Sequence, residues 1–419
     1  MDSQREALKA LGPGFLFAAV SIGASHLVQS TRAGAGHGLS LMVVIVLAMV
    51  LKYPLFEFGH RYAAATGTSL LEGYRKQGRW TLVVYLVLTL GTMFTVLAAV
   101  TAVTAGLAIQ LIGTDWSLFT WSVVITAACA LLIAIGRYPL LDAAIKLIMV
   151  LLALSTIAAV VAALPGVQPG RLWGPVRATD IAFIVGLVGW MPTGMDVSVW
   201  QSFWSLARRR QTGHVPTLKQ ALFDFRLGYI GTGIIALLFC GLGAAVMFNS
   251  GVGIDRSASG FARQLIELYT STLGEWSRPI IGTAALTAML STTLTVIDGF
   301  PRALQLTGRR LVGPESESEV STSAVRTIDF WIWAAVLIAG ALLIIRFAMT
   351  SLLGLVDVAT ILSFVTAPFL ATLTYRAMTA PDVPEEFRPG RGLRTTAILG
   401  IFFLLAFLAY FLHHRFLAP

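Results

Sequence analysis

Charged residues are scarce in this sequence, and their scarcity excludes most classes of soluble protein. Asp, Glu, Lys and Arg together make up 12% of the 419 residues, whereas apolar residues make up 56%. A water-soluble domain carries about a quarter charged residues. The apolar residues form runs of about 20, the length needed to cross a hydrocarbon core about 30 Å thick. The sequence therefore predicts an all-α membrane protein.

Cysteine, a cleavable leader and the familiar catalytic motifs are also missing or rare. The two cysteines, Cys129 and Cys240, fall within apolar runs, which indicates buried thiols rather than a disulfide framework. The N-terminal MDSQREALKALGPGF mixes acidic and basic residues without a small-residue cleavage site, so we expect the first span to be retained. Nucleophile–base pairs, H-E-x-x-H helices and phosphate-binding glycine loops do not occur. We expect neither an enzyme nor a cofactor.

Long apolar runs between polar connectors predict about eleven spanning helices in a single transmembrane domain over residues 1–419. The predicted spans are 10–34, 38–60, 80–111, 118–136, 142–165, 180–206, 222–248, 278–300, 329–347, 349–375 and 394–413. The stretch 251–278 is expected to form a short amphipathic external segment, and 313–324 a flexible connector.

The net charge of +9 raises the question of a nucleic-acid partner, but the basic residues lie in short connectors between apolar runs. With the N-terminus placed on one side, the alternate connectors of that side hold 21 of the 30 Lys and Arg residues, and the other side holds 8. The positive-inside rule then predicts a cytoplasmic N-terminus in a cell membrane. The lipid bilayer is the expected environment, nucleic acid is not an expected partner, and the oligomeric state is left open.

Two of the predicted spans contain helix-breaking residues near their middles. The first, within 12–38, carries Gly23 and His26, and the sixth, within 185–204, carries Pro192 among several glycines. Proline removes a backbone donor and clashes with the preceding turn. Unwound backbone at membrane depth is tolerated where it is buried in protein or lines a cavity. Two interrupted spans, five apart, predict a substrate site between the breaks.

Polar side chains inside the spans point to function, because they are costly there. His26 lies at the first break and is either a ligand or a histidine satisfied by a neighbouring helix. Asp196 follows the second break and is either a ligand or a helix-start carboxylate favoured by the dipole. Lys52 and Glu57, in the second span, are expected to form a structural pair or to snorkel to the cytoplasmic face. Two more carboxylates are expected near span ends or in a polar cavity: Asp298 and Asp357.

Several short motifs occur in order along the chain: LGPGF at 11–15, Ala-Gly-Ala at 33–35, ATGTSLLE at 65–72, Met191-Pro192, and DGF at 298–300. In this order and spacing the chain resembles the Nramp family of divalent-metal transporters. The resemblance implies a LeuT-type fold with helices 1 and 6 broken. It also implies two inverted five-helix repeats, at about 10–165 and 180–375, and an extra helix at about 394–413.

The site motifs of the family are altered in this chain. The family's first break reads Asp-Pro-Gly-Asn, and the four matching positions are Gly23, Ala24, Ser25 and His26. The family's Met-Pro-His in the sixth span is matched by Met191, Pro192 and Thr193, with the carbonyl of Val188 one turn earlier. The third span has none of the acidic residues that the family uses for proton passage, which argues against proton coupling.

These matches give a predicted substrate site of eight residues: Gly23, Ser25, His26, Val188, Met191, Thr193, Asp196 and Thr366. The expected metal ligands among them are His26, Met191 and Asp196. We expect a secondary transporter that moves a small inorganic ion by alternating access. A divalent transition metal is the first choice, because imidazole and thioether are soft ligands.

Two alternatives stay open. The same fold would carry an anion or a small polar organic solute, because the first break has lost its carboxylate and half-helix N-termini attract anions. A non-transporting sensor or scaffold would keep the fold after losing the site. The sequence shows no appended soluble domain through which such a sensor would signal.

Overall fold

The computed structural model describes residues 11–135, 138–167, 172–313 and 327–416, and these residues are almost entirely helical. The described residues include eight helices that are long and apolar enough to cross a membrane. The expectation of an all-α, multi-pass membrane protein is therefore confirmed. The helices of the predicted first, fifth and sixth spans are not among the eight, so the count of about eleven stays a prediction.

The first half of the chain forms the predicted spans one to five together with a short helix after the second span. Its elements are α2 (Pro13–Ser21), the π-helix η1 (Ser25–Ser30), α3 (Thr31–His37), α4 (Met42–Thr66), α5 (Leu70–Lys76), α6 (Arg79–Ile112), α7 (Leu118–Ile135), α8 (Tyr138–Ala163) and η2 (Leu164–Gly166).

The second half forms the remaining predicted spans. Its elements are η4 (Ala178–Asp180), α9 (Ile181–Trp190), α10 (Asp196–Thr212), α11 (Leu218–Gly243), η5 (Ala244–Phe248), α12 (Ala258–Leu273), η6 (Glu275–Ser277), α13 (Arg278–Val312), α15 (Ile328–Leu343), η7 (Ile344–Ala348), α16 (Leu352–Met378), η8 (Glu385–Phe387) and α17 (Arg391–Phe416). Helix α12 occupies the segment expected to be amphipathic, and nearly all of the expected connector at 313–324 lies outside the described residues.

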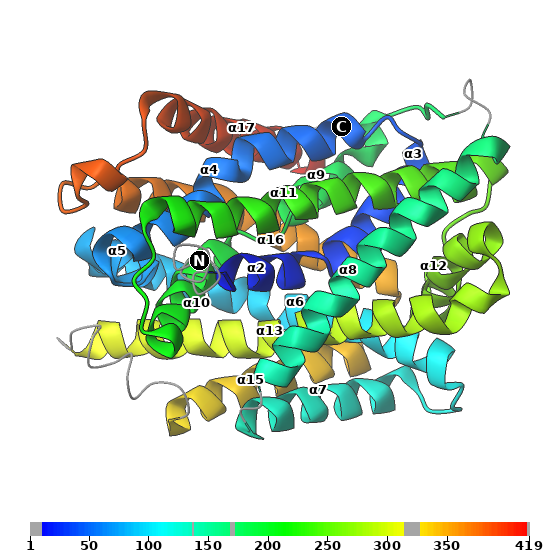
Figure 1. Ribbon diagram of the computed structural model, residues 1–419, viewed down its shortest axis with the longest axis horizontal. Coiled ribbons are helices and arrows are strands. Elements are labelled where there is room, and N and C mark those ends of the chain that lie inside the picture. Colours follow the sequence, from blue (N-terminus) through cyan, green and yellow to red (C-terminus); the bar gives the residue numbers. More distant parts are fainter. Residues whose placement is uncertain (1–10, 136–137, 168–171, 314–326, 417–419) are drawn as a thin grey trace, which may run out of the picture.

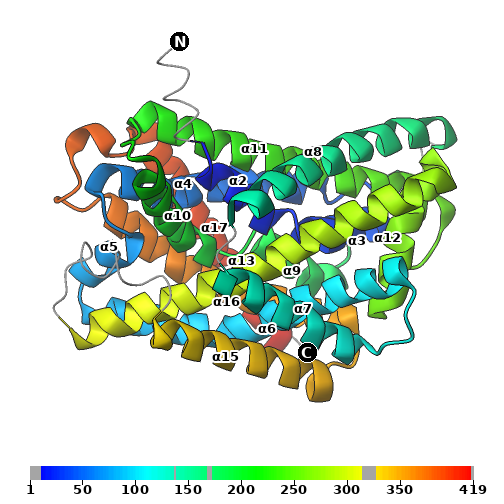
Figure 2. The ribbon, with the colours of Figure 1, turned by 60° about the horizontal axis from the view of Figure 1, so that its bottom comes forward.

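The long helices lie side by side, and the broken spans run through the middle of the bundle. In Figure 1, α4 and α17 lie along one edge, α7 and α15 lie along the opposite edge, and α2 lies between them. Helix α13 packs along α6, and α16 packs against both α6 and α9. Figure 2 shows α8 and α13 as long helices that cross the bundle at different inclinations. Neighbouring helices therefore pack around the two broken spans: α13 contacts α2 and α10, and α16 contacts α9.

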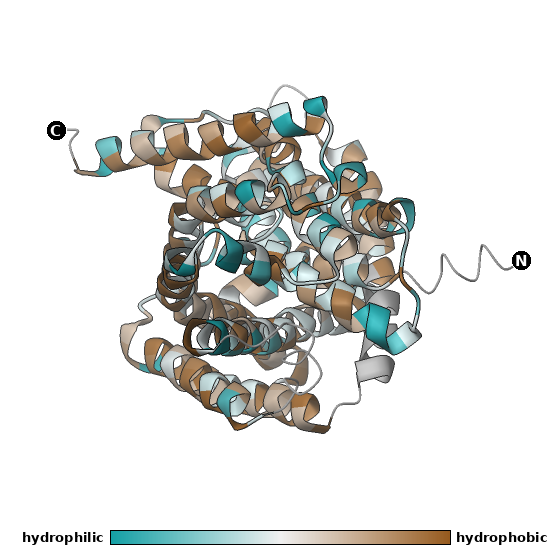
Figure 3. Ribbon diagram, turned by 90° about the vertical axis from the view of Figure 1, so that its left-hand side faces the viewer, coloured by the Kyte–Doolittle hydropathy of each residue, from teal (hydrophilic) through white to brown (hydrophobic). Residues whose placement is uncertain are grey.

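The outward faces of the long helices are apolar, as a lipid environment requires. Large side chains are exposed on α17 (Phe402, 69%), α6 (Val87, 61%) and α8 (Leu154, 61%). Figure 3 looks toward the helix ends and shows the hydrophobic colour dominating the outer helices, while hydrophilic residues gather in the connecting segments. A soluble monomer rarely exposes apolar surface on this scale. The same surface is satisfied by lipid.

Both predicted helix breaks are present. Helix α2 ends at Ser21, Ile22 leaves helical geometry with φ −79° and ψ 47°, and the chain resumes as a π-helix at Ser25. Helix α9 ends at Trp190, the Met191–Pro192 peptide bond is cis, and α10 begins at Asp196. The glycines and the proline at these points therefore predicted the breaks to within a few residues.

Glycine allows two close helix contacts that hold the broken spans in place. A Cβ at Gly14 of α2 would collide with the backbone carbonyl of Asp224 on α11. A Cβ at Gly59 of α4 would collide with the backbone carbonyl of Ser198 on α10. Small residues at such contacts are the usual means by which helices approach closely inside membranes. Each broken span thus packs closely against an intact span from the other half of the chain.

Candidate functional site

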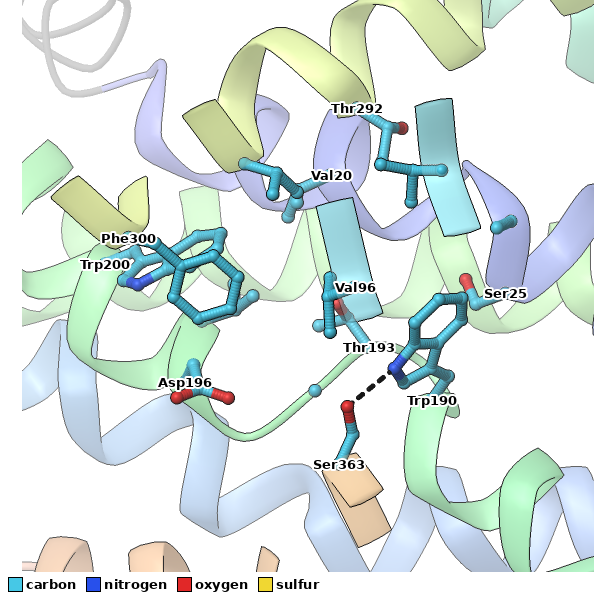
Figure 4. Close-up of a pocket in the computed structure, with 15 residues that line it drawn as sticks. Val20, Ser25, Val96, Trp190, Thr193, Asp196, Trp200, Thr292, Phe300 and Ser363 are labelled. Carbon is cyan, nitrogen blue, oxygen red and sulfur yellow. Dashed lines mark hydrogen bonds between the residues drawn. The ribbon is translucent and has the colours of Figure 1, made fainter. Parts of the chain in front are cut away.

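A small buried cavity of about 40 Å³ lies between the two helix breaks. Ser25 lines it from the first break, and Thr193 and Asp196 line it from the second. Figure 4 shows Trp200 with Phe300 on one side of this space, and Trp190 with Ser363 on the other. A volume of this size accommodates a water molecule or a small ion. Three polar side chains from the two breaks therefore face a common space.

Asp196 is the charged group of the cavity. It is the first residue of α10, where the helix dipole favours a carboxylate, and it is 4% exposed. Its Oδ1 atom is buried and has no hydrogen-bond partner. In the described ranges, no group of three or more His, Cys, Asp and Glu side chains comes together, at the cavity or elsewhere. A buried carboxylate oxygen without a partner is costly, and a cation or a proton would satisfy it.

Hydroxyl groups supply the other oxygen atoms around the cavity. The Ser363 hydroxyl accepts a hydrogen bond from Trp190 Nε1 at 2.9 Å. The Thr292 hydroxyl, on α13, donates to the Ala19 carbonyl at 3.1 Å and so holds α2 just before the first break. The Ser25 hydroxyl contacts the Ser21 carbonyl of the same span. The cavity therefore offers one carboxylate and several neutral oxygen atoms.

His26 lies beside the cavity but does not line it. Its Nδ1 atom is 2.7 Å from the Ser25 hydroxyl, and its Nε2 atom is 2.9 Å from the backbone carbonyl of Thr232 on α11. The side chain is fully buried. An Nε2 that faces a carbonyl carries the proton, because a carbonyl oxygen only accepts. Both ring nitrogens are thus engaged, and the arrangement is that of a histidine satisfied by a neighbouring helix.

Four other predicted residues also stay outside the cavity lining. The Gly23 carbonyl accepts the Leu27 N–H at 2.9 Å, and the Thr366 hydroxyl donates to the Ser363 carbonyl at 3.0 Å. Met191 is completely buried, and the Val188 carbonyl accepts a hydrogen bond from a lysine. Of the eight predicted site residues, the structure gathers three around the cavity: Ser25, Thr193 and Asp196.

That lysine is Lys52, on α4. Its Nζ atom lies 3.0 Å from the Val188 carbonyl, 3.1 Å from the Gly189 carbonyl and 3.3 Å from the Thr193 carbonyl. The side chain is completely buried, so the expectation that it snorkels to the surface is wrong. It does not pair with Glu57 either, because Glu57 binds Arg61 at 2.5 Å. The open carbonyls at the end of α9 attract the ammonium inward.

An ion pair joins two helices beyond the C-terminal end of the first broken span. Arg32, on α3, binds Asp357 of α16 through two hydrogen bonds of 2.7 and 3.3 Å. The Arg32 guanidinium also lies 4.8 Å from the ring centroid of Phe183 on α9. Asp357 is therefore an interhelical partner near a span end, one of its two expected places. Both broken spans meet α16 at this point.

A second set of contacts closes the opposite end. The Asp224 carboxylate on α11 accepts the backbone N–H groups of Gly12 and Gly14 at 3.0 and 2.6 Å, and so caps the start of α2. Glu72 of α5 forms an ion pair with Arg310 of α13. With both ends closed, the polar cavity residues are at most 8% exposed. These side chains are therefore shielded from solvent.

Comparison with known proteins assigns this architecture. A model of the family described as "Nramp: Natural resistance-associated macrophage protein-like" matches residues 14–414. An uncharacterized protein of Pasteurella multocida is 33% identical over 411 residues, which cover 96% of this chain and 92% of that protein.

Among solved structures, a mutant of the Eremococcus coleocola manganese transporter aligns over 99% of this chain and 89% of its own, with a TM-score of 0.67 and 14% identity. The protein MhsT, in complex with L-phenylalanine, aligns over 94% and 98% with a TM-score of 0.55 and 15% identity. These likenesses confirm the LeuT-type fold. The repeat boundaries at about 10–165 and 180–375 stay a prediction.

Proposed function

The chain belongs to the Nramp family, and from this premise we propose that it is a secondary transporter that moves a small metal cation by alternating access. Members of the family are transporters and not enzymes. The observation that carries the proposal is the buried carboxylate of Asp196, whose Oδ1 atom has no hydrogen-bond partner, in the small cavity between the two breaks. The description of a structural relative as a manganese transporter agrees with a metal as the substrate.

The donors around the cavity favour a hard cation over a soft one. Asp196, Ser25, Thr193 and Ser363 offer oxygen atoms, whereas no imidazole or thioether lines the cavity. Mg²⁺ and Mn²⁺ prefer such oxygen ligands, and Mg²⁺ is often held by one carboxylate while it keeps several waters. Soft coordination by His26 would require its ring to leave the Thr232 carbonyl. We therefore place the transported ion at Asp196, with hydroxyl groups and water completing its shell.

Alternating access requires that the two closures open in turn. We propose that release of Arg32 from Asp357 opens the outer path, and that release of α2 from Asp224 opens the inner one. The predicted division into two repeats gives these motions their frame, with the N-terminus on the cytoplasmic side of a cell membrane. Helix α6 carries no acidic residue along its length, so we propose transport without a proton relay through this helix.

A second candidate substrate is a small organic ammonium ion. The indoles of Trp190 and Trp200 and the ring of Phe300 line the cavity together with Asp196. Aromatic faces attract desolvated cations, and a single carboxylate neutralises a monovalent ion completely. An anion is disfavoured, because it would face the unpartnered carboxylate. The two candidates share Asp196 and differ in what the aromatic walls contribute.

Uptake into proteoliposomes distinguishes these substrates. Radioactive Mn²⁺, fluorescently detected Mg²⁺, Cd²⁺ and Zn²⁺ form one arm, and labelled methylammonium and ethanolamine form the other. We expect uptake of Mn²⁺ or Mg²⁺ by the wild-type chain, together with loss of that uptake in Asp196→Asn. Uptake of the organic ions alone would establish the second candidate. No uptake of any of these cations would contradict both.

A further inference from the structure

The break in the sixth span creates an acceptor-rich point deep in the bundle. A helix leaves its last four carbonyl groups without intrahelical partners, and α9 ends at Trp190 in the middle of the protein. At this depth water is not available to satisfy them, and each unpaired group costs several kcal/mol. The Met191 N–H reaches the Val188 carbonyl at 3.3 Å, but the Gly189 and Thr193 carbonyls need other donors.

Lys52 supplies those donors from another helix. An ammonium group has three N–H donors, and Lys52 Nζ lies within 3.3 Å of three carbonyl oxygens. In the described part of the chain, no carboxylate lies within ion-pair distance of Lys52, and its nearest ring contact is Phe56, with the centroid 5.6 Å away. The three carbonyl oxygens thus surround the ammonium group as they would surround a free cation.

The charges at the break follow the helix dipoles. Lys52 lies at the C-terminal, negative end of α9, and Asp196 lies at the N-terminal, positive end of α10. Helix α9 therefore receives its complementary charge from Lys52 of α4, and α10 receives its own from its first residue, Asp196. A free cation that approached these carbonyls would be repelled by the ammonium group of Lys52.

We propose that the carbonyls of Val188, Gly189 and Thr193 form a monovalent-cation site that Lys52 fills as a tethered ion. The break then needs no free Na⁺, K⁺ or NH₄⁺, and the transported ion is confined to the Asp196 side. Removing the lysine side chain vacates the site. The fold should then depend on a small cation from solution.

The experiment measures thermal unfolding of the purified full chain in detergent, in ammonium chloride and in choline chloride at equal ionic strength. The variant Lys52→Ala opens a space that ammonium can enter, and choline is too large to enter it. We expect the Tm of Lys52→Ala to lie about 4 °C or more higher in ammonium, because a ligand that binds the folded state raises its stability. The wild-type Tm should be the same in both salts.

Lys52→Met is the matched control, because its side chain fills the space without a charge. Its Tm should be lowered equally in both salts. The proposal is overturned if Lys52→Ala shows no greater ammonium effect than the wild type. Should Lys52→Ala be recovered in neither salt, a Lys52→Met protein at least as stable as the wild type would also overturn it, and one less stable than the wild type would support it. The readout is the ammonium effect of Lys52→Ala relative to that of the wild type, and Asp196 is the same in both, so its failure is separate from failure of the proposed function.

Discussion

The two helix breaks of this transporter face the same cavity, but neutral groups satisfy the first break and charged groups lie at the second. At the first break, neutral groups satisfy one another: His26 binds the Thr232 carbonyl, and the Thr292 hydroxyl binds the Ala19 carbonyl. At the second break, two buried charges meet the backbone, since Lys52 binds the end of α9 and Asp196 begins α10. The first break is therefore closed by hydrogen bonds, whereas the second keeps a carboxylate oxygen, Asp196 Oδ1, without a partner.

This difference shows how a family fold can keep its site and move its charge. The resemblance to Nramp proteins implies an aspartate at the first break, where this chain has Gly23. The carboxylate that faces the cavity comes from Asp196, across the same space. A cavity enclosed by two breaks accepts a charged ligand from either side. In the proposed site, the cavity sets where the ion would lie, and the sequence of each break sets which side would hold it.

The largest expected effect comes from removing the charge at the second break. Asp196→Asn preserves size and should lower cation uptake about 100-fold, because hydrogen bonds or ion contacts to a charged group contribute about 1.5–3 kcal/mol and each 1.4 kcal/mol is tenfold. The measurement is initial uptake into proteoliposomes at matched protein density. An unchanged elution profile and an unchanged or raised Tm show that the fold is intact. Uptake within threefold of wild type would remove Asp196 from the site.

A smaller effect is expected at the outer closure that joins both broken spans. Arg32→Met removes the ion pair with Asp357, which is partly exposed and worth about 1 kcal/mol. We expect outward opening to increase about fivefold. The measurement is the rate at which a membrane-impermeant maleimide labels Val197→Cys, a cavity position, in a background without Cys129 and Cys240.

The reciprocal exchange, Arg32→Asp with Asp357→Arg, is the control for this closure. It should return the labelling rate toward that of the parent, because the ion pair is restored with its charges reversed. Equal labelling rates in the parent and in Arg32→Met would show that this pair does not close the path.

A modest effect is expected from the hydroxyl that the first break contributes to the cavity. Ser25→Ala should raise the KM for the cation about threefold, because one neutral hydrogen bond is worth about 0.5–1.5 kcal/mol. The maximal rate should change less, and the KM is obtained from uptake at varied ion concentration. A loss of cation uptake as large as that expected for Asp196→Asn would show that the first break contributes as much to ion binding as the second.

The smallest effect on ion affinity is expected from His26. His26→Ala leaves the Thr232 carbonyl unpaired and should destabilise the fold by about 1–3 kcal/mol. The KM for the cation should stay within about twofold, since this ring does not line the cavity. His26→Gln retains a donor for that carbonyl and should recover part of the Tm. A loss of affinity without a loss of Tm would identify His26 as a ligand.

The sequence was sufficient for the fold because its signals are local. Apolar runs predicted the spans, and Gly23 and Pro192 predicted the breaks, since each acts on its own turn of backbone. Asp196 was expected to be either a helix-start carboxylate or a ligand, and it does begin α10. Contacts between distant segments were not predictable from a single sequence. Lys52 meets carbonyls more than 130 residues away, and Arg32 meets a partner 325 residues away.

The direction of a side chain was the other quantity that the sequence did not contain. His26 and Ser25 are neighbours at the same break, yet the hydroxyl lines the cavity and the imidazole faces α11. The π-helical turn that begins at Ser25 sets these directions, and a π-helix has no reliable sequence pattern. The soft ligand set of His26 and Met191 depended on directions of this kind, and it stays a prediction.

Calorimetric titration of Mn²⁺ into the purified chain tests most directly whether the second break holds the ion. The wild type, Asp196→Asn and His26→Ala are titrated under identical conditions. We expect binding heat for the wild type and for His26→Ala with similar affinity, and none for Asp196→Asn. Binding retained in Asp196→Asn and abolished in folded His26→Ala would contradict this expectation and return the site to the first break.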